Sequence, residues 1–232
     1  TNNPLDRYRF NEAYLMHAST SPQYSIIASC DIAAAMMDAP GGTALTEESL
    51  IEAMDFRHAM RKAEAQFAEL NTWWFKVWGP EHLPNNGIGS SSDWQIKAGD
   101  DWHGFGAIEP DMNILDPIKT TVMMPGLNMT GTFEETGIPA AIVAKYLSDY
   151  GIIIDKVGLY SFFVIFNIGI TKGRWSSLLI ELQQFKDIYD DNKPVWRIFP
   201  EFAKSYPQYE KMGIKDLCQA IHDTYKKYNI AH

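Results

Sequence analysis

Residues 100–105 carry the side chains in this sequence that are best suited to chemistry. They read Asp-Asp-Trp-His-Gly-Phe, so two carboxylates lie close to the imidazole of His103 in the chain. Carboxylates beside an imidazole can carry out general acid–base chemistry. The same residues also fit a tight loop, in which Gly104 supplies backbone freedom while Trp102 and Phe105 pack inward. The sequence alone leaves both interpretations open.

Hydroxyl groups gather at an expected helix start in residues 19–22, which read Ser-Thr-Ser-Pro. Hydroxyls and free N–H groups at a helix N-terminus can bind phosphate. Serine and threonine are also preferred helix caps, and Ser21 followed by Pro22 suits a cap and a first helical residue. Spacing alone therefore favours capping over phosphate binding.

Asp155 is a third candidate, because it follows three isoleucines at the end of an expected strand. A carboxylate in this position can meet a cationic ligand. It can equally be a solvated strand end or pair with Lys156, and an exposed pair of this kind contributes little to stability.

Several common enzyme sites are absent from the sequence. It contains no Gly-x-Ser-x-Gly segment, no phosphate-binding loop that ends in Gly-Lys-Ser/Thr, and no His-Glu-x-x-His. The six histidines are scattered, and none pairs with another at metal-ligand spacing. We therefore expect no metal site.

Composition narrows the class of protein. The chain has 232 residues, 46% of them hydrophobic, which is enough for a core and suggests one or two domains. A net charge of −9 argues against nucleic acids and anionic membranes as partners. The start is polar and lacks Met, so we interpret it as a processed or cut end without a signal peptide. Cys30 and Cys218 are expected to be buried, reduced thiols in a cytoplasmic protein.

Hydrophobic periodicity predicts an α+β fold. Helices are expected at residues 9–16, 22–37, 46–70, 138–150, 175–188 and 214–228, the third of them capped by Thr46. Strands are expected at residues 73–78, 119–124, 152–156 and 159–167. Residues 79–110 should be mostly loop. The order strand, helix, strand, strand, helix predicts a small sheet with helices on one face.

Three segments are distinctive, and they read Trp-His-Gly-Phe at residues 102–105, Leu-Asp-Pro-Ile-Lys at 115–119 and Gly-Ile-Pro-Ala at 137–140. In this order and spacing the chain resembles the bacterial ornithine/lysine/arginine decarboxylases, large pyridoxal-phosphate enzymes of fold type I. Further matching segments are found at residues 10–14, 17–22, 33–37, 125–126 and 185–186.

The resemblance implies a domain organisation. Residues 1–40 would be the tail end of the large, aminotransferase-like domain that binds pyridoxal phosphate. Residues 41–190 would form the small α+β domain, and residues 191–232 would begin the C-terminal domain of the family. The complete enzyme would belong to the α/β class.

The resemblance also implies decarboxylation of a basic amino acid, in which the cofactor ring accepts electrons as carbon dioxide leaves. Residues 134–139, 171–175 and 212–217 look most similar to acid-inducible arginine decarboxylases, which form agmatine. Asp155 lies where lysine and ornithine enzymes tend to carry Glu, and both substrates stay open as alternatives.

The resemblance implies roles for individual residues of this chain, where they match the family's positions. Ser19 aligns with a hydroxyl residue that contacts the cofactor phosphate across a dimer interface, with Thr20 and Ser21 as its neighbours. Asp155 aligns near the pocket for the substrate side chain, and Trp102 and His103 belong to a family segment that we group with substrate binding.

Catalytic residues are expected to be missing from this chain. The lysine that holds the cofactor lies in a Ser-x-His-Lys segment of the family, and no such segment occurs here. We therefore expect the chain to be part of a larger enzyme and inactive alone. The complete enzyme would be a homodimer at least, and up to five dimers in a ring. The alternative is a non-catalytic module for dimerisation or regulation.

Overall fold

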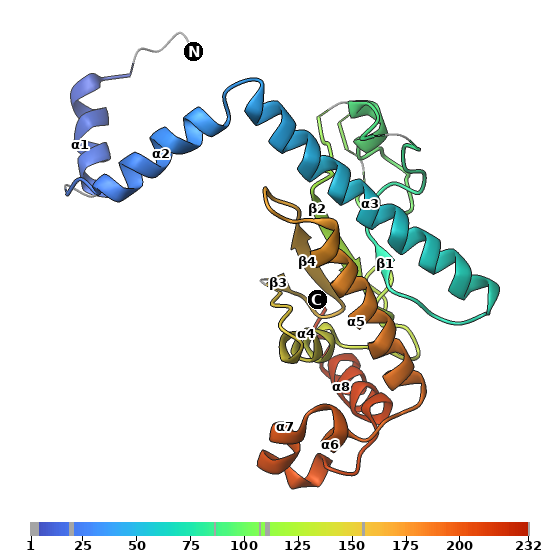
Figure 1. Cartoon of the computed structure of the whole chain (residues 1–232). Coiled ribbons are helices and arrows are strands. Elements are labelled where there is room, and N and C mark those ends of the chain that lie inside the picture. Colours follow the sequence, from blue (N-terminus) through green and yellow to red (C-terminus); the bar gives the residue numbers. More distant parts are fainter. Residues whose placement is uncertain are drawn as a thin grey trace. The chain divides into compact units, whose positions relative to one another are not determined.

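The computed structural model describes residues 5–18, 21–85, 87–106, 108–109, 112–154 and 156–231. The chain divides into two compact units, Thr1–Thr46 and Glu47–His232, which are described separately (Figure 1).

The first unit contains helices α1 (Arg7–His17) and α2 (Tyr24–Met36), neither of which has a buried residue. Asp6 caps α1, since its carboxylate accepts hydrogen bonds from the Tyr8 and Arg9 N–H groups. The cap predicted for the second helix is wrong. The residue at that position is Gln23, in an extended conformation, because the helix begins after Pro22 and not at it. Cys30 is exposed, against expectation.

Helix α3 (Gly41–Glu69) begins before the predicted cap Thr46. The Thr46 hydroxyl instead donates to the Gly42 carbonyl oxygen at 2.8 Å, so it is satisfied within the helix. Gly42 permits this early start, because a Cβ atom there would lie 2.1 Å from the Met37 carbonyl oxygen. Gly41 and Gly42, a residue type that usually ends helices, therefore lie in the first turn of α3.

A four-stranded antiparallel sheet is present in the second unit, with the order β1-β2-β4-β3. Its strands are β1 (Lys76–Val77), β2 (Lys119–Met123), β3 (Lys156–Val157) and β4 (Ser161–Ile165). Val122 lies opposite Phe162, and both are buried. Their neighbours Met123 and Ser161, on the other face, are partly exposed. One face of the sheet is therefore in the core, as predicted.

The two outer strands are shorter than predicted. Trp74 and Phe75 precede β1 and are buried in the core, but they make no ladder pair. Ile152 and Ile154 precede β3 and pack against the same core. These segments are apolar because they pack against other elements, and this signal cannot be told from that of a buried strand.

The remaining helices complete the core of the second unit. They are α4 (Ala140–Asp149), α5 (Lys172–Asp190), α6 (Val195–Ile198), α7 (Pro200–Ser205) and α8 (Ile214–Tyr228), with 3-10 turns η1 (Ser91–Trp94) and η2 (Pro207–Tyr209). One hydrophobic cluster joins Phe56 of α3, Leu147 of α4, Phe185 of α5 and Leu217 of α8. The α+β class predicted from the sequence is confirmed. The domain boundaries given above concern the whole protein and stay a prediction.

Candidate functional site

His103 lies in a loop that its own side chain holds together. The imidazole is 5% exposed, and its Nε2 atom lies 2.8 Å from the Lys97 carbonyl oxygen. Its Nδ1 atom accepts the Phe105 N–H at 3.0 Å. Since a carbonyl oxygen can only accept, the proton of the neutral ring is on Nε2. Both nitrogen atoms are therefore engaged within the loop, and acid–base chemistry by His103 would require this loop to open.

The neighbours of His103 divide between the core and the surface. Trp102 is partly buried, its ring lies 4.9 Å from the Trp78 ring, and its indole N–H donates to Asp100 at 3.1 Å. Gly104 has a φ of 66°, and a Cβ atom there would lie 2.4 Å from the Met129 carbonyl oxygen. Phe105 is 54% exposed, so the expectation that it packs inward is wrong. Its ring stacks on the imidazole of His103 instead.

A buried guanidinium beneath this region was not foreseen from the sequence. Arg57 of α3 is fully buried and donates to three carbonyl oxygens, those of Trp78, Pro117 and Lys119. Burial, reinforced by the charge of Arg61, lowers the pKa of Arg57 from 12.5 to about 10, so it stays charged at neutral pH. Arg57 thereby joins the end of β1 to the start of β2. The sequence did contain one signal for this burial, because Arg57 falls among the apolar residues on one side of its helix.

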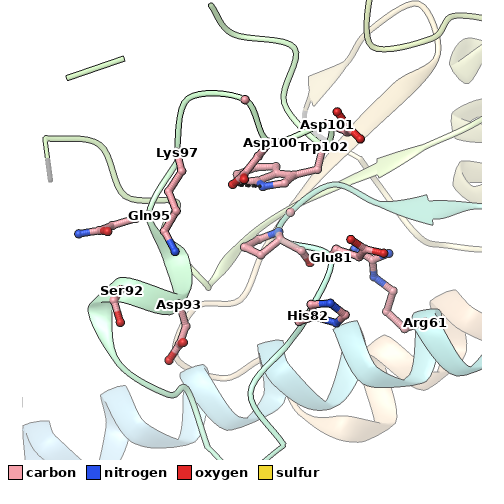
Figure 2. Close-up of a pocket in the computed structure, with 13 residues that line it drawn as sticks. Arg61, Glu81, His82, Ser92, Asp93, Gln95, Lys97, Asp100, Asp101 and Trp102 are labelled. Atoms are coloured by element: carbon pink, nitrogen blue, oxygen red, sulfur yellow. Dashed lines mark hydrogen bonds between the residues drawn. The ribbon is translucent and has the colours of Figure 1, made fainter. Parts of the chain in front are cut away.

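A polar cleft of about 630 Å³ lies beside Trp102 (Figure 2). Four carboxylates border it, those of Glu81, Asp93, Asp100 and Asp101, together with the cations Arg61 and Lys97. The Ser90 N–H and O–H groups both donate to Asp93 and lower the pKa of this carboxyl group. With two more anions than cations, the cleft is suited to ligands that carry ammonium groups.

Asp155, the predicted partner of the substrate side chain, lies outside the described residues. Its chain neighbours Ile154 and Lys156 both line a second hollow, of about 680 Å³, formed with Phe163 and Trp175. This hollow and the cleft beside Trp102 share no lining residue in the described part of the chain. The structure therefore does not bring Trp102 into the same pocket as the neighbours of Asp155.

The predicted phosphate-binding segment lies in the first unit. Ser19 and Thr20 are outside the described residues, and Ser21 is exposed just before α2. The cap residue Gln23 makes no side-chain hydrogen bond to the first turn of this helix. The first turn of α2 therefore receives no cap from the Gln23 side chain, and the phosphate-binding role of residues 19–21 stays a prediction.

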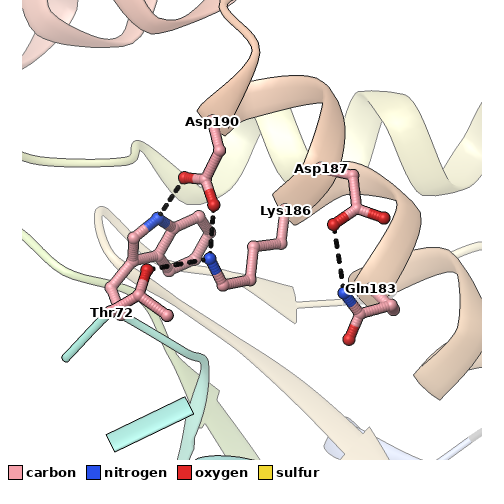
Figure 3. Close-up of polar contacts among 6 residues, drawn as sticks. Thr72, Gln183, Lys186, Asp187 and Asp190 are labelled. Atoms are coloured by element: carbon pink, nitrogen blue, oxygen red, sulfur yellow. Dashed lines mark hydrogen bonds and ion pairs between the residues drawn. The ribbon is translucent and has the colours of Figure 1, made fainter. Parts of the chain in front are cut away.

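Cofactor attachment is a different matter, because it requires an available lysine. Lys186 of α5 is the only buried lysine in the described part of the chain. Figure 3 shows its ammonium group held by Asp190 and by the Thr72 hydroxyl. The rings of Phe67 and Trp73 lie 4.8 and 5.0 Å from it. Lys186 is therefore committed to the core, and the position of the attachment lysine stays a prediction.

Two kinds of feature are absent from the described residues, a metal cluster and a membrane-spanning helix. No three His, Cys, Asp or Glu side chains among them come together in a group that could hold a metal ion. None of the helices formed by these residues combines the length and the apolar character needed to cross a membrane.

Solved structures place this fold among amino-acid decarboxylases. Lysine decarboxylase A from Pseudomonas aeruginosa matches with a TM-score of 0.87 and 46% identity, over 99% of this chain and 31% of that chain. The constitutive lysine decarboxylase of Escherichia coli matches with a TM-score of 0.84 and 36% identity, over 99% and 31%. The sequence pattern of the Orn/Lys/Arg decarboxylase major domain matches residues 1–174. The chain belongs to the Orn/Lys/Arg decarboxylase family.

Curated relatives carry three substrate names, lysine, arginine and ornithine. A lysine decarboxylase of Pseudomonas aeruginosa is 47% identical over 96% of this chain, and the biodegradative arginine decarboxylase of Escherichia coli is 38% identical over 95%. The chain spans only 30% and 31% of the length of these two relatives.

Proposed function

We propose that this chain is part of a pyridoxal-phosphate enzyme that decarboxylates a basic amino acid, with lysine ahead of arginine and ornithine. The observation that carries the proposal is the 47% identity, over 96% of the chain, to a lysine decarboxylase. Arginine, the first expectation from the sequence, is supported less well, since the arginine enzyme is 38% identical.

Each predicted residue has a defined task in this proposal. Pyridoxal phosphate, when bound, supplies the ring that accepts electrons from the bond to the departing carboxylate. Ser19, with Thr20 and Ser21 beside it, binds the phosphate of the cofactor. Asp155 attracts the distal ammonium group of the substrate. Trp102 and His103 shape the loop that borders the polar cleft.

The whole enzyme is proposed to be a cytoplasmic homodimer at least, with up to five dimers in a ring. A phosphate contact made across an interface requires a second copy near residues 19–21. Sedimentation of the whole enzyme at pH 5 and pH 7.5 would test this, and a monomer at both values would overturn it.

A chimera tests the activity directly. The 232 residues would replace the matching segment of the Pseudomonas aeruginosa lysine decarboxylase, and release of carbon dioxide would be measured with lysine, arginine and ornithine. We expect the highest kcat/KM with lysine. Asp155→Asn should raise KM about tenfold or more, because an uncompensated ammonium group loses roughly 1.4 kcal/mol or more of binding. Ser19→Ala should raise the cofactor concentration needed for half-maximal activity.

The control is Thr224→Ala, since the Thr224 hydroxyl is exposed and bonds only within α8. This variant should leave both constants unchanged. A chimera that folds and binds cofactor, yet releases no carbon dioxide from any of the three amino acids, would refute the proposal and favour the non-catalytic module.

Titration of the isolated chain with pyridoxal phosphate, borohydride reduction and intact mass gives an independent test. We expect no stoichiometric adduct on a single lysine, because Lys186 is buried and paired. One stoichiometric adduct would show that attachment occurs within this chain and that the assigned roles are wrong.

A further inference from the structure

A smaller hollow lies where β1 begins and β2 ends, and its volume is about 250 Å³. Lys76 of β1 and Met123 of β2 lie opposite each other in the sheet, and both line this hollow. Its described lining also contains an indole, a carboxylate and two more thioethers, those of Trp74, Glu134, Met124 and Met129. We call it the β1–β2 hollow. Among the described residues, it shares none of its lining with the polar cleft or with the hollow beside β3.

Trp74 in this lining carries a hydrogen-bond donor without an acceptor. The residue is 4% exposed, and its indole N–H has no partner in the described part of the chain. Its ring stacks on that of Phe67 at 4.7 Å, which holds the indole in place. Buried donors normally find an acceptor, so this one points to a ligand group in the adjoining hollow. The methionines of the wall have flexible side chains that can turn aside to admit such a group.

Glu134 supplies a carboxylate whose position is fixed by its own loop. Its Oε2 atom accepts the Gly126 N–H at 2.7 Å, and its backbone N–H donates to the Gly126 carbonyl oxygen at 3.0 Å. The residue is exposed and forms no ion pair with another described residue. A carboxylate can accept about four hydrogen bonds, so Glu134 can still bind an ammonium group.

Lys76 supplies the opposite charge. Its side chain is 64% exposed, and its ammonium group lies 3.9 Å from Glu64 Oε1, which is a long ion pair. The Glu64 carboxylate is also shared with Arg61, whose Nη1 atom lies 3.6 Å from Oε2. Exposed pairs of this kind are weak, so Lys76 is available to the carboxylate of a ligand.

The volume of the hollow sets the size of the ligand. A cavity of about 150 Å³ can hold benzene, so about 250 Å³ suits a molecule with roughly ten non-hydrogen atoms. The three thioethers favour an apolar, unbranched body, because methionine adapts its shape to what it contacts. The two charged side chains favour a ligand that carries both an anionic and a cationic group.

We propose that the β1–β2 hollow binds a free α-amino acid with an unbranched apolar side chain, such as norleucine or methionine. The α-ammonium group pairs with Glu134, and the α-carboxylate accepts hydrogen bonds from Lys76 and from the Trp74 indole. The apolar side chain of the ligand lies against the three methionines. The inference does not rest on the decarboxylase proposal, because it concerns this chain without cofactor or substrate.

The test uses the whole 232-residue chain and follows norleucine binding by ligand-observed NMR titration. We expect saturable binding at one site. Glu134→Gln and Lys76→Gln should each weaken it by about tenfold, as for the loss of one charge-assisted contact. Glu134→Gln keeps a side-chain oxygen atom for the Gly126 N–H, and Lys76 is exposed. Both variants should therefore keep the melting temperature of the parent chain.

Matched controls remove the same charges elsewhere. Glu135→Gln and Lys62→Gln change exposed residues outside the lining and should leave norleucine binding unchanged. Trp74→Phe keeps an aromatic ring beside Phe67 and removes only an N–H that has no partner in the free chain, so it should weaken binding as well. Unchanged norleucine binding in both Glu134→Gln and Lys76→Gln would overturn the proposal.

Three further ligands separate the inference from its alternatives. Hexanoate lacks the ammonium group of norleucine, pentylamine lacks its carboxylate, and lysine adds a charge at the end of the chain. We expect each to bind at least about tenfold more weakly, since each loses a charged contact or buries an ammonium group among thioethers. Equal binding of hexanoate or pentylamine would overturn the proposed amino-acid site. Equal binding of lysine would assign the hollow to the decarboxylase substrate and also overturn it.

Discussion

Lys186 and Asp190 form an ion pair whose partners differ in their contact with water. The Lys186 side chain is 3% exposed and that of Asp190 is 40% exposed. Asp190 also accepts a hydrogen bond from the Trp73 indole N–H at 2.8 Å, and this second contact fixes the position of its carboxylate. Removing the cation leaves a carboxylate that water can solvate, whereas removing the anion leaves a buried cation without a counterion.

Substitutions of Lys186 and of Asp190 should therefore lower the free energy of unfolding by unequal amounts. Asp190→Asn should lower the free energy of unfolding by about 3 kcal/mol, the usual result of stranding a buried charge. Lys186→Met should cost less, about 1 kcal/mol, because a thioether packs well between Phe67 and Trp73. Urea unfolding gives both values. If Lys186→Met proves the more costly change, the ammonium group contributes more than its burial costs and the argument is wrong.

Because of Cys218, the free energy of unfolding of the second unit should fall at alkaline pH. Burial raises the pKa of this thiol from 9.0 to about 12. The folded state therefore keeps the thiol neutral where the unfolded state loses its proton. The resulting stabilisation is complete below pH 9 and is lost as pH rises from 9 towards 12.

The parent chain should accordingly lose about 1 kcal/mol more stability than Cys218→Ala between pH 8 and pH 10. Urea unfolding at the two pH values, compared between the two proteins, measures the difference. Cys30→Ala is the control, since Cys30 is exposed and its loss should leave the pH dependence unchanged. Parallel pH profiles for the parent and Cys218→Ala would contradict the assignment.

Residue roles were predictable only in part. Ser19 and Asp155 were already candidates from the sequence, as part of a hydroxyl cluster at a helix start and as a carboxylate at a strand end. Capping or a solvated strand end explained these positions at least as well, and only the family resemblance assigned them to cofactor and substrate. The loop role of His103 was one of two interpretations of residues 100–105, and only the positions of its two nitrogen atoms favour it. Arg57 and Lys186 were not foreseen, because a charged residue on a helix is normally assigned to the solvent-facing side.

Between elements, helix α8 packs closely against the loop at residues 125–138. His222 of α8 is fully buried, with Nδ1 2.6 Å from the Tyr160 hydroxyl oxygen and Nε2 3.1 Å from the Glu134 carbonyl oxygen. A Cβ atom at Gly137 would lie 2.2 Å from His222 Nδ1. The glycine of the Gly-Ile-Pro-Ala segment is therefore explained by the close approach of an imidazole ring.

Gly137→Ala should lower the free energy of unfolding by about 2 kcal/mol, because the added methyl group would push on a buried ring that is hydrogen-bonded at both nitrogen atoms. Gly106→Ala is the matched control, since a Cβ atom there would meet nothing within 4 Å. Thermal or urea unfolding of the two variants tests the contact. Equal stabilities would show that α8 moves away from the loop at no cost.

Element boundaries show where sequence patterns fail. The long amphipathic helix α5 and the alternating strand β2 were predicted well, because their periodicities differ clearly. The start of α3 was missed, since glycines are normally helix-ending residues, but here Gly41 and Gly42 lie in the first turn, and the position of Gly42 has no room for a side chain. The strands at 73–78 and 152–156 were predicted too long, because buried apolar segments need not pair.

Across the whole molecule, the two units differ in how they can be stable. The first unit has two helices of 11 and 13 residues without a buried residue, and isolated helices of this length are marginal in water. The second unit has a continuous hydrophobic core. Such a composition is expected of a segment whose apolar residues are covered by other parts of a larger protein.

Limited proteolysis should therefore remove the first unit. Thermolysin should cut within residues 8–37 first and leave a resistant fragment that contains residues 47–232, identified by intact mass. Far-UV circular dichroism should show that this fragment melts at the temperature of the parent chain. Protection of residues 8–37 that equals that of the core would show that the first unit is stable alone.

The strand order also has a consequence for synthesis on the ribosome. Central strand β2 pairs on one side with β1, the strand before it in sequence, and on the other with β4, which follows only after β3. The sheet therefore cannot close until the chain through Ile165 has emerged. Trp73 and Phe75 also pack against Tyr189 and Phe185 of α5. These rings therefore remain exposed in the nascent chain until α5 has emerged as well, and they form an attractive binding site for a chaperone during this interval.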